Sequence, residues 1–335
     1  MAADKSKGGL DRVLVLEVAR VTEVAAIAAA RWRGKGSNKS ADKAAVDAMR
    51  KELGRVAIRG IVVIGEGEMD EAPMLYIGEK VGTGEGPEVD IAVDPLEGTT
   101  ICAKDMPNAL AVIAISEKGG LLNAPDMYMD KIAIGPGYPD GIIDLDRPVE
   151  QVLRDLAAAK KAPVSEITAC ILDRPRHQDL IDQCRKVGAA VRLIPDGDIA
   201  GVIWTTNARQ TGIDIYLGSG GAPEGVLAAA ALRCIGGQMQ GRLSPERHDA
   251  KERPELVARA AKMGIKDIKK KYSMAEMACD DVIFAATGVT DGSLLSGVHF
   301  NGEFAETESV VMRSKTGTVR RIKTMFRGIG TKPIV

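Results

Sequence analysis

The chain has 335 residues, of which 45% are hydrophobic and 27% charged, a mixture typical of globular proteins. Its 45 Lys and Arg balance 46 Asp and Glu, so no overall basic field points to a nucleic-acid partner. The sequence contains neither an apolar run of about 18 residues nor an apolar signal core. We therefore expect a cytoplasmic protein of roughly two domains, with no membrane contact and with its five cysteines reduced.

The N-terminal part predicts two helices. Apolar residues follow helical spacing over residues 10–32, and Ser40 is the expected N-cap of a second helix that ends before Gly54. Asp42 lies in the first turn of that helix, on its apolar stripe, where it could stabilise the helix dipole or act as a ligand.

Strands are expected to follow these helices. Short apolar runs predict them at residues 61–64, 89–93, 109–116 and 121–122. A segment rich in Gly, Pro and Asp at residues 135–146 then indicates a boundary between domains at 1–146 and 147–335. This order favours layered α and β elements in the first domain.

Beyond that boundary helices and strands alternate. Helices are expected at 149–159, 178–187, 199–205 and 223–234, and strands at 167–172, 191–194, 213–217, 282–286 and 309–312. A basic run, residues 313–327, ends the pattern. The sequence therefore predicts an α/β protein.

The densest chemical signal is Asp94-Pro95-Leu96-Glu97-Gly98-Thr99 at the end of an apolar strand. Pro95 turns the chain, so Asp94 and Glu97 can face one point, and two adjacent carboxylates favour a hard cation between them. Gly98 allows close backbone approach, and Thr99 places a hydroxyl beside the pair. A plain strand-ending turn is the other interpretation of these residues.

An acidic segment follows the strand at residues 61–64. It contains Glu66, Glu68, Asp70 and Glu71, interleaved with glycine. Such a segment can be a solvated loop, but its position after a buried strand makes a ligand site an equally good interpretation.

A glycine-rich segment, residues 218–225, joins an expected strand to an expected helix. Turns of this kind bind anions through exposed backbone N–H groups. Pro223 suits the first helical turn. Glu224 suits a metal ion next to a phosphate better than the phosphate itself.

Two further strand-end loops carry charged side chains. Residues 173–177 offer Arg174, Arg176 and His177, and residues 196–198 offer Asp196 and Asp198. Arginines suit phosphates and carboxylates suit sugar hydroxyls. His177 is interpreted as a capping or phosphate-contacting residue in preference to a general base.

These segments, with N-A-P-D-M-Y-M-D and A-A-T-G-V-T-D-G, together resemble class II fructose-1,6-bisphosphatases of the lithium-sensitive phosphatase superfamily, from about Leu14 to Arg327. The resemblance implies an αβαβα sandwich of the sugar-phosphatase type in two domains, with the active site between them. It also implies hydrolysis of the 1-phosphate of fructose 1,6-bisphosphate with Mn²⁺ or Mg²⁺, and a homo-oligomer, dimer or tetramer.

The resemblance assigns roles to particular residues. The implied metal ligands are Asp42, Glu66, Asp94, Glu97 and Glu224. Asp70 falls on a position that the family needs for activity. For catalysis we expect Thr99 to act with Glu68 or Asp70 as the acceptor of its proton, and the sequence leaves both acceptors open. The implied substrate-binding residues are Glu97, Gly98, Thr99, Tyr128, Arg174, Pro175, Arg176, Asp196, Gly197, Asp198 and Gly221.

The chain departs from the family pattern at two places. Family members often carry Asp-Lys-Asn or Asp-Lys-Lys where this chain has Ser37-Asn38-Lys39, so Lys39 is only a candidate for the functional lysine. Some members carry Arg where this chain has Thr100.

Three other activities stay open. A dual fructose-1,6-/sedoheptulose-1,7-bisphosphatase fits the same motifs, because the two sugars differ by one carbinol unit. A catalytically inactive sugar-phosphate sensor is disfavoured by the intact carboxylates. An inositol monophosphatase has no use for a second phosphate site at Arg174 and Arg176.

Overall fold

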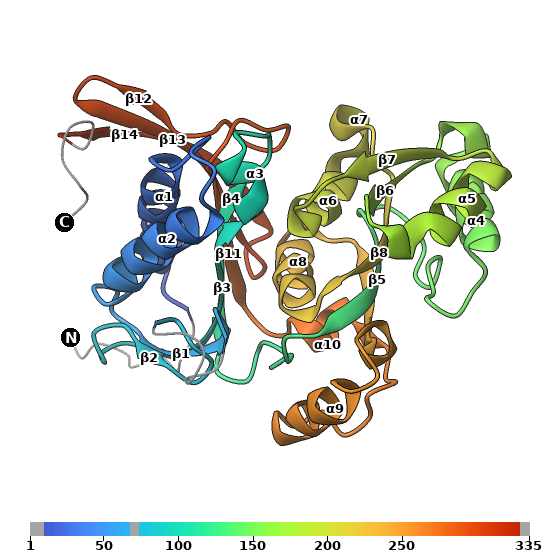
Figure 1. The fold of residues 1–335 in the computed structure, drawn as a ribbon, viewed down its shortest axis with the longest axis horizontal. Coiled ribbons are helices and arrows are strands. Elements are labelled where there is room, and N and C mark those ends of the chain that lie inside the picture. Colours follow the sequence, from blue (N-terminus) through green and yellow to red (C-terminus); the bar gives the residue numbers. More distant parts are fainter. Residues whose placement is uncertain (1–9, 68–73, 329–335) are drawn as a thin grey trace, which may run out of the picture. The chain divides into compact units, whose positions relative to one another are not determined.

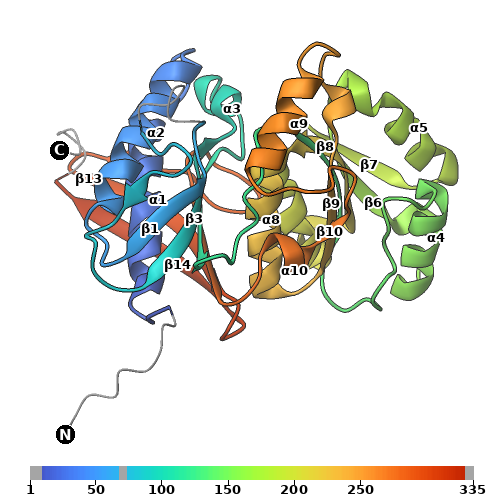
Figure 2. The same cartoon turned by 90° about the horizontal axis from the view of Figure 1, so that it is seen from below.

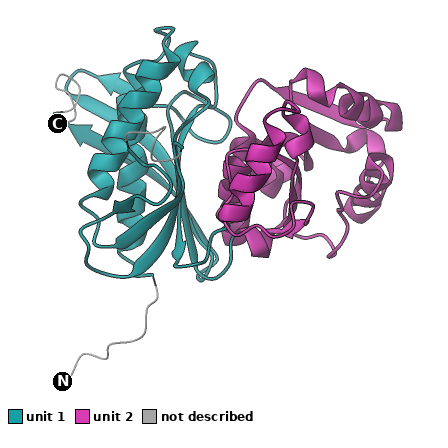
Figure 3. Cartoon of the chain, turned by 60° about the horizontal axis from the view of Figure 1, so that its bottom comes forward, with its two compact units in different colours: residues 1–122, 278–335 teal, residues 123–277 magenta. Residues whose placement is uncertain are grey.

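The chain forms two compact units (Figure 3). The computed structural model describes residues 10–67 and 74–328. Unit 1 comprises residues 1–122 and 278–335, and unit 2 comprises residues 123–277. The boundary expected after residue 146 lies inside unit 2, and the C-terminal segment belongs with the N-terminal one. The reason is strand pairing, because β11 (Val282–Gly288) lies between β4 (Leu110–Glu117) and β13 (Phe304–Arg313) in one sheet.

Among the described residues, unit 1 builds a sheet of eight strands in the order β12-β13-β11-β4-β3-β1-β2, with β14 paired to β13. Helices α1 and α2 lie along this sheet (Figure 1). The remaining elements of unit 1 are α1 (Leu14–Ala30), α2 (Asn38–Leu53), β1 (Arg59–Ile64), β2 (Lys80–Val81), β3 (Glu88–Glu97), α3 (Thr99–Ala103), β12 (His299–Asn301) and β14 (Thr318–Arg327).

The core of unit 1 is aliphatic. Small and branched side chains of α1, including Val18, Val21 and Ala25, are fully buried, and they join one cluster with residues of α2 and of the sheet. Burying such side chains stabilises the fold by about 1.5–3 kcal/mol for each large one. Ser37, and not Ser40 as expected, caps α2, because its hydroxyl accepts the N–H of Ser40 at 3.3 Å.

Unit 2 lies wholly within the described residues and contains a six-stranded sheet in the order β10-β9-β5-β8-β6-β7. Helices α4 and α5 cover one face of this sheet (Figure 2), and α6 and α8 cover the other (Figure 1). Its elements are β5 (Tyr128–Ile134), α4 (Val149–Lys160), η1 (Val164–Glu166), β6 (Thr168–Leu172), η2 (Pro175–His177), α5 (Gln178–Val187), β7 (Ala190–Ile194), α6 (Asp198–Trp204), η3 (Thr205–Asn207), α7 (Ala208–Thr211), β8 (Ile215–Gly221), α8 (Ala222–Ile235), β9 (Gln238–Leu243), η4 (Pro245–Arg247), α9 (Arg253–Lys262), β10 (Tyr272–Ser273) and α10 (Met274–Met277).

The predicted α/β layered architecture is confirmed, with local differences. Residues 121–122 form no strand, only an isolated bridge between Leu121 and Ala278. Residues 218–221 are the end of β8, not a turn, and the basic run is mostly β14. No helix in the described ranges is both long and apolar enough to cross a membrane.

Candidate metal and sugar-phosphate site

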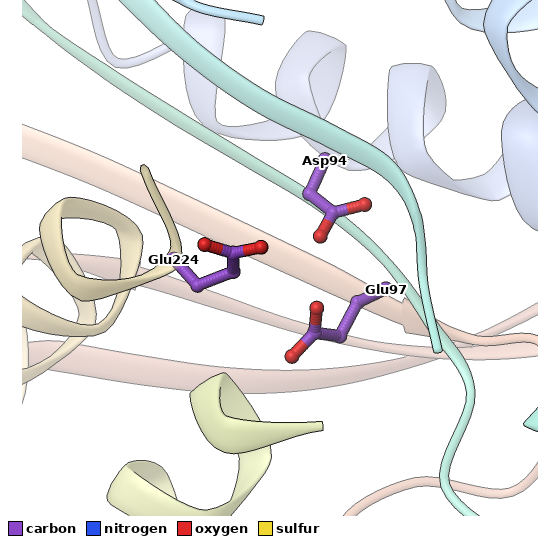
Figure 4. Close-up of side chains that lie close together, drawn as sticks. All are labelled: Asp94, Glu97 and Glu224. Atoms are coloured by element: carbon purple, nitrogen blue, oxygen red, sulfur yellow. The ribbon is translucent and has the colours of Figure 1, made fainter. Parts of the chain in front are cut away.

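The carboxylates of Asp94 and Glu97 lie side by side in unit 1 (Figure 4). One oxygen of each lies within 4.8 Å of the other. The pairing of β3 with β4 shifts between these two residues, because Asp94 lies opposite Val112 and Glu97 opposite Leu110. The extra residue is a bulge, and bulges redirect side chains in this way.

This pair has the chemistry of a site for a hard cation. Two carboxylate charges about 5 Å apart repel each other by roughly 3 kcal/mol at an effective dielectric constant of ~20. Carboxylate oxygens are also the donors that Mg²⁺ prefers, and they suit Mn²⁺. The donor set that unit 1 presents therefore fits a divalent metal ion.

The chain turns sharply after Glu97 and enters a short helix. Gly98 has φ of +81°, in the left-handed region where glycine is unstrained, and it is the N-cap of α3. Thr99 is therefore the first residue of α3, two residues beyond Glu97 and partly exposed. Thr99 is thus separated from Glu97 only by the turn at Gly98.

The two departures from the family pattern contact each other. The side-chain amide of Asn38, at the start of α2, donates a hydrogen bond of 3.0 Å to the hydroxyl of Thr100. A neutral pair thus joins α2 to α3 at these two positions.

The remaining acidic candidates of unit 1 are only partly placed. Asp42 is half-buried in α2, and burial raises the pKa of its carboxyl. Glu66 follows β1, and its backbone N–H donates to the carbonyl of Leu75 at 3.0 Å. Glu68 and Asp70 lie outside the described residues.

In unit 2, the predicted glycine-rich segment forms the last residues of β8 and leads directly into α8. Gly220 leaves space for a neighbouring side chain, because a Cβ there would lie 2.3 Å from Oδ2 of Asp198. Gly221 is the N-cap of α8, and Glu224 lies in the first turn of that helix. Glu224 is the third carboxylate labelled in Figure 4.

A buried lysine, Lys131, contacts both of these segments. The ammonium group of Lys131, on β5, forms an ion pair with Asp198 and donates to the carbonyl of Gly221 at 2.7 Å. The Tyr216 hydroxyl donates to the same oxygen of Asp198 at 3.5 Å. Lys131 thereby fastens the start of α6 to the end of β8.

The two charged loops after β6 and β7 contact each other. Arg174 donates to the carbonyl of Pro195 and forms an ion pair of 3.6 Å with Asp196. Burial raises the pKa of Asp196, an effect that Arg174 partly offsets. Pro175 begins the 3-10 helix after β6, and Gly197 is the left-handed N-cap of α6.

Tyr128 is held on both sides. The guanidinium of Arg176 lies 4.7 Å from the centre of its ring, a cation–π contact, and the ring of His248 lies 4.7 Å away. The backbone N–H of Tyr128 donates to Nε2 of His248 at 3.0 Å. The structure thus brings Tyr128 and Arg176 together, and their role in substrate binding stays a prediction.

His177 joins two strands of unit 2. It is buried, Nδ1 lies 2.8 Å from the Leu172 carbonyl, and Nε2 accepts the N–H of Ser219 at 2.8 Å. Both hydrogen bonds form when Nδ1 carries the proton and donates it, while the unprotonated Nε2 accepts, so the ring is neutral. Burial lowers its pKa, and the nearby cations Arg176 and Arg247 lower it further. This geometry supports a structural role.

Three residues of this region were not singled out in the sequence: Lys131, Arg247 and His248. Lys131 and Asp130 are two adjacent charged residues in a strand that is otherwise mostly apolar, and this adjacency was the available signal. Arg247 and His248 follow β9, where a cation and an imidazole after a strand repeat the pattern of residues 173–177.

The fold and the carboxylate pair define a class: a layered α/β protein of the sugar-phosphatase type with an acidic group that can hold a metal ion. The model of one family, "Bacterial fructose-1,6-bisphosphatase, glpX-encoded", matches residues 12–326. The chain therefore belongs to this family of bacterial class II fructose-1,6-bisphosphatases.

Curated relatives agree along almost the whole chain. "Fructose-1,6-bisphosphatase 1 class 2" of Escherichia coli (strain K12) is 50% identical over 94% of this chain and 95% of its own length. "D-fructose 1,6-bisphosphatase class 2/sedoheptulose 1,7-bisphosphatase" of Synechococcus sp. (strain JA-3-3Ab) is 47% identical over 97% and 98%. A solved structure, the extragenic suppressor protein suhB from Bartonella henselae, is 16% identical over 58% of this chain and 74% of that chain, with a TM-score of 0.33.

Proposed function

We propose that this chain hydrolyses the 1-phosphate of fructose 1,6-bisphosphate to fructose 6-phosphate and phosphate, a reaction of gluconeogenesis. The adjacent carboxylates of Asp94 and Glu97, next to Thr99 in a chain of this family, are the observation that carries the proposal. We further propose that the protein acts in the cytoplasm as a homo-oligomer, a dimer or tetramer, on a sugar bisphosphate and not on nucleic acid or a membrane.

The proposed metal site uses five carboxylates: Asp42, Glu66, Asp94, Glu97 and Glu224. A bound Mn²⁺ or Mg²⁺ would supply positive charge that stabilises the negative charge developing on the phosphate. The protein's contribution is to hold the carboxylates in place, through the bulge of β3 for Asp94 and Glu97 and through the first turn of α8 for Glu224. Glu97, with Gly98, is also proposed to contact the substrate.

The Thr99 hydroxyl is proposed to carry the proton step. It either orients the attacking water and relays its proton to a carboxylate, or attacks the phosphorus itself and gives its own proton to that carboxylate. In both cases the bond between phosphorus and O1 of the sugar breaks and fructose 6-phosphate leaves. After direct attack, water then cleaves the phosphothreonine. Glu68 and Asp70 are the proposed acceptors.

The sugar and its second phosphate are proposed to bind unit 2. Arg174 and Arg176 would hold the phosphate that does not react, since guanidinium groups bind phosphate oxygens in pairs. Tyr128, Asp196 and Asp198 would contact sugar hydroxyls, the last through Oδ1, because Oδ2 pairs with Lys131. The backbone at Pro175, Gly197 and Gly221 completes this proposed set.

A dual fructose/sedoheptulose bisphosphatase is the second candidate. The name of the Synechococcus relative, 47% identical to this chain, favours it. The catalytically inactive sugar-phosphate sensor stays as a third proposal, which the carboxylate pair disfavours.

Phosphate release from a panel of sugar phosphates, with Mn²⁺ and with chelator, tests these proposals together. We expect release from fructose 1,6-bisphosphate only with metal, and none from inositol monophosphate. A ratio of kcat/KM near one for the fructose and sedoheptulose bisphosphates would establish the dual enzyme. Binding without release from any member of the panel would establish the sensor.

A further inference from the structure

Residues 244–271 form an insertion between strands β9 and β10. The two strands are antiparallel neighbours, with Gly241 opposite Tyr272, so a short turn would be enough to connect them. The insertion instead carries η4 and α9, and α9 lies away from the sheet of unit 2 (Figure 1). Ala260 is the one buried residue of α9, so this helix adds little to the core.

The start of the insertion holds the backbone of Tyr128 at both of its polar groups. The carbonyl of Tyr128 accepts the N–H of Ser244 at 2.8 Å, which continues the pairing of β5 with β9. The N–H of Tyr128 donates to a side chain instead, to Nε2 of His248 at 3.0 Å. The first residue of β5 is therefore fixed by the segment that follows β9.

Contacts within the insertion hold His248 in this position. Its N–H donates to the carbonyl of Pro245 at 3.1 Å, and its carbonyl accepts Nε of Arg253, the first residue of α9, at 3.0 Å. Because Nε2 accepts a hydrogen bond, the proton of the neutral ring is on Nδ1, which lies 4.0 Å from the carboxylate of Glu252. The start of α9 thus supports both the backbone of His248 and the tautomer that can accept.

The ring of His248 also packs against the phenol ring of Tyr128. The two ring centres are 4.7 Å apart, and the ring planes are inclined by 41°. Tyr128 is only partly buried, so its side chain is open to a ligand while its ring contacts His248. A tyrosine without such a contact would have more conformational freedom, and a ligand that fixes it would bind less tightly.

We propose that His248 is a positioning residue for the sugar. It holds the backbone and the ring of Tyr128 in the arrangement in which the phenol hydroxyl contacts the substrate, and α9 keeps His248 in place. This inference rests on the proposed function, in which Tyr128 contacts a sugar hydroxyl. His248 acts through a residue that binds the sugar and not the reacting phosphate, so its effect should appear in KM and not in kcat.

Three substitutions separate the two contacts between His248 and Tyr128. His248→Leu removes both, His248→Phe keeps the ring without the acceptor, and His248→Gln keeps an acceptor without the ring. The first two should raise KM for fructose 1,6-bisphosphate at least fivefold with kcat unchanged within twofold, and the third should stay within threefold of the unaltered chain. His299→Leu, the same change at an exposed histidine of unit 1, is the matched control and should alter neither constant. A KM within twofold for both His248→Leu and His248→Phe would overturn the inference.

A double variant tests whether the effect passes through the tyrosine. Tyr128→Phe removes the phenol hydroxyl and should itself raise KM. Adding His248→Leu to it should raise KM less than twofold further, because the group that His248 positions is already gone. Increases in KM that multiply would mean that His248 acts on the substrate by another route, and the inference would be wrong.

Hydrogen exchange of the Tyr128 amide gives a readout that needs no substrate. The amide should exchange at least tenfold faster in His248→Leu and His248→Phe than in His248→Gln and the unaltered chain. The amide of Ile132, inside β5, is the internal reference and should exchange alike in all four proteins, which separates this effect from a general loss of stability. Equal exchange of the Tyr128 amide in all four would overturn the inference.

The proposed function can fail separately. If the unaltered chain hydrolyses no sugar bisphosphate, the proposed function is overturned, and the affinity for fructose 6-phosphate, measured by calorimetry, takes the place of KM. Weaker binding to His248→Leu and His248→Phe, with faster exchange of the Tyr128 amide, would then keep the inference. Equal affinities in all four proteins would overturn it as well.

Discussion

The ammonium group of Lys131 and the carboxylate of Asp198 form an ion pair in which the side chains are 0% and 6% exposed. Removing one partner from such a pair leaves a buried charge without compensation, at a cost of about 3–5 kcal/mol. Because Lys131 also binds the carbonyl of Gly221, it holds two of the proposed substrate-binding segments in one arrangement.

We expect Lys131→Met to lower the free energy of unfolding by about 3–5 kcal/mol, as measured by urea denaturation. The double variant Lys131→Met, Asp198→Asn should recover most of this loss, because a neutral asparagine needs no buried cation beside it. Arg154→Met, which breaks the exposed pair with Glu150 in the same unit, should cost less than about 1 kcal/mol. A loss below about 1 kcal/mol for Lys131→Met would contradict the importance of the buried pair.

Asp94→Asn should abolish turnover and leave the fold intact. The substitution removes a proposed ligand, but it also relieves repulsion from Glu97, so the apo-protein should not lose stability. Phosphate release and Mn²⁺ affinity measure the first effect, and the urea midpoint measures the second. Glu88→Gln, an exposed carboxylate at the opposite end of β3, is the control and should keep full activity. Full activity of the unaltered chain in excess chelator would overturn the metal site.

Thr99→Ala should lower kcat by about 10²–10⁴-fold with little change in KM, because the hydroxyl acts in the transition state. Thr99→Ser keeps the hydroxyl and should retain substantial activity. Thr100→Val is a matched control at the next residue, where the hydroxyl binds Asn38, and its kcat should stay within a few-fold. Steady-state kinetics on all three variants test whether the Thr99 hydroxyl takes part in the proton step. A near-normal kcat for Thr99→Ala would show that it does not.

His177 should make stability depend on pH. Its pKa in the folded protein lies below the unfolded value of about 6.5, because burial and the cations Arg176 and Arg247 outweigh the opposing effects of the Leu172 carbonyl and Asp130. The unfolded chain therefore binds the proton more readily. The stabilisation by neutral His177 is fully present above about pH 6.5 and is lost as the pH falls toward the folded pKa.

Urea midpoints at pH 7.5 and 5.5 test this expectation. The unaltered chain should lose more stability between the two values than His177→Gln, with a difference of at most ~1.4 kcal/mol per pH unit. Acidic groups elsewhere titrate equally in both proteins, so the comparison isolates His177. Equal losses in the two proteins would contradict the prediction.

Features that depend on neighbouring residues could be predicted from the sequence. Helix α5 lies at the expected residues 178–187, because its apolar spacing and the following Gly188 are local signals. The sequence also predicted that Asp94 and Glu97 lie close together, but the cause is a bulge inside β3, which continues to Glu97, and not a strand that ends at Asp94. The assignment of both carboxylates as metal ligands stays a proposal.

Features that depend on distant partners could not be predicted. Strand β5 was missed because Asp130 and Lys131 interrupt its apolar pattern, and their partners Arg247 and Asp198 are far away in the sequence. The end of β8 was predicted as a turn because it is rich in glycine. In the structure these glycines leave space for side chains of other segments, as Gly220 does for Asp198. The predicted domain boundary was wrong for the same reason, because the pairing of β11 with β4 joins residues that are remote in the sequence.

That pairing also sets the order in which the chain can fold during synthesis. Strand β4 leaves the ribosome early, but its partner β11 follows only after all of residues 123–277. Unit 2 is continuous in sequence and can form first, as domains do during translation. The half-built sheet of unit 1 meanwhile exposes an apolar strand edge, a surface prone to mispairing. Translation that stops before residue 282 should therefore leave an aggregation-prone fragment, whose soluble yield rises when the missing C-terminal segment is supplied in trans.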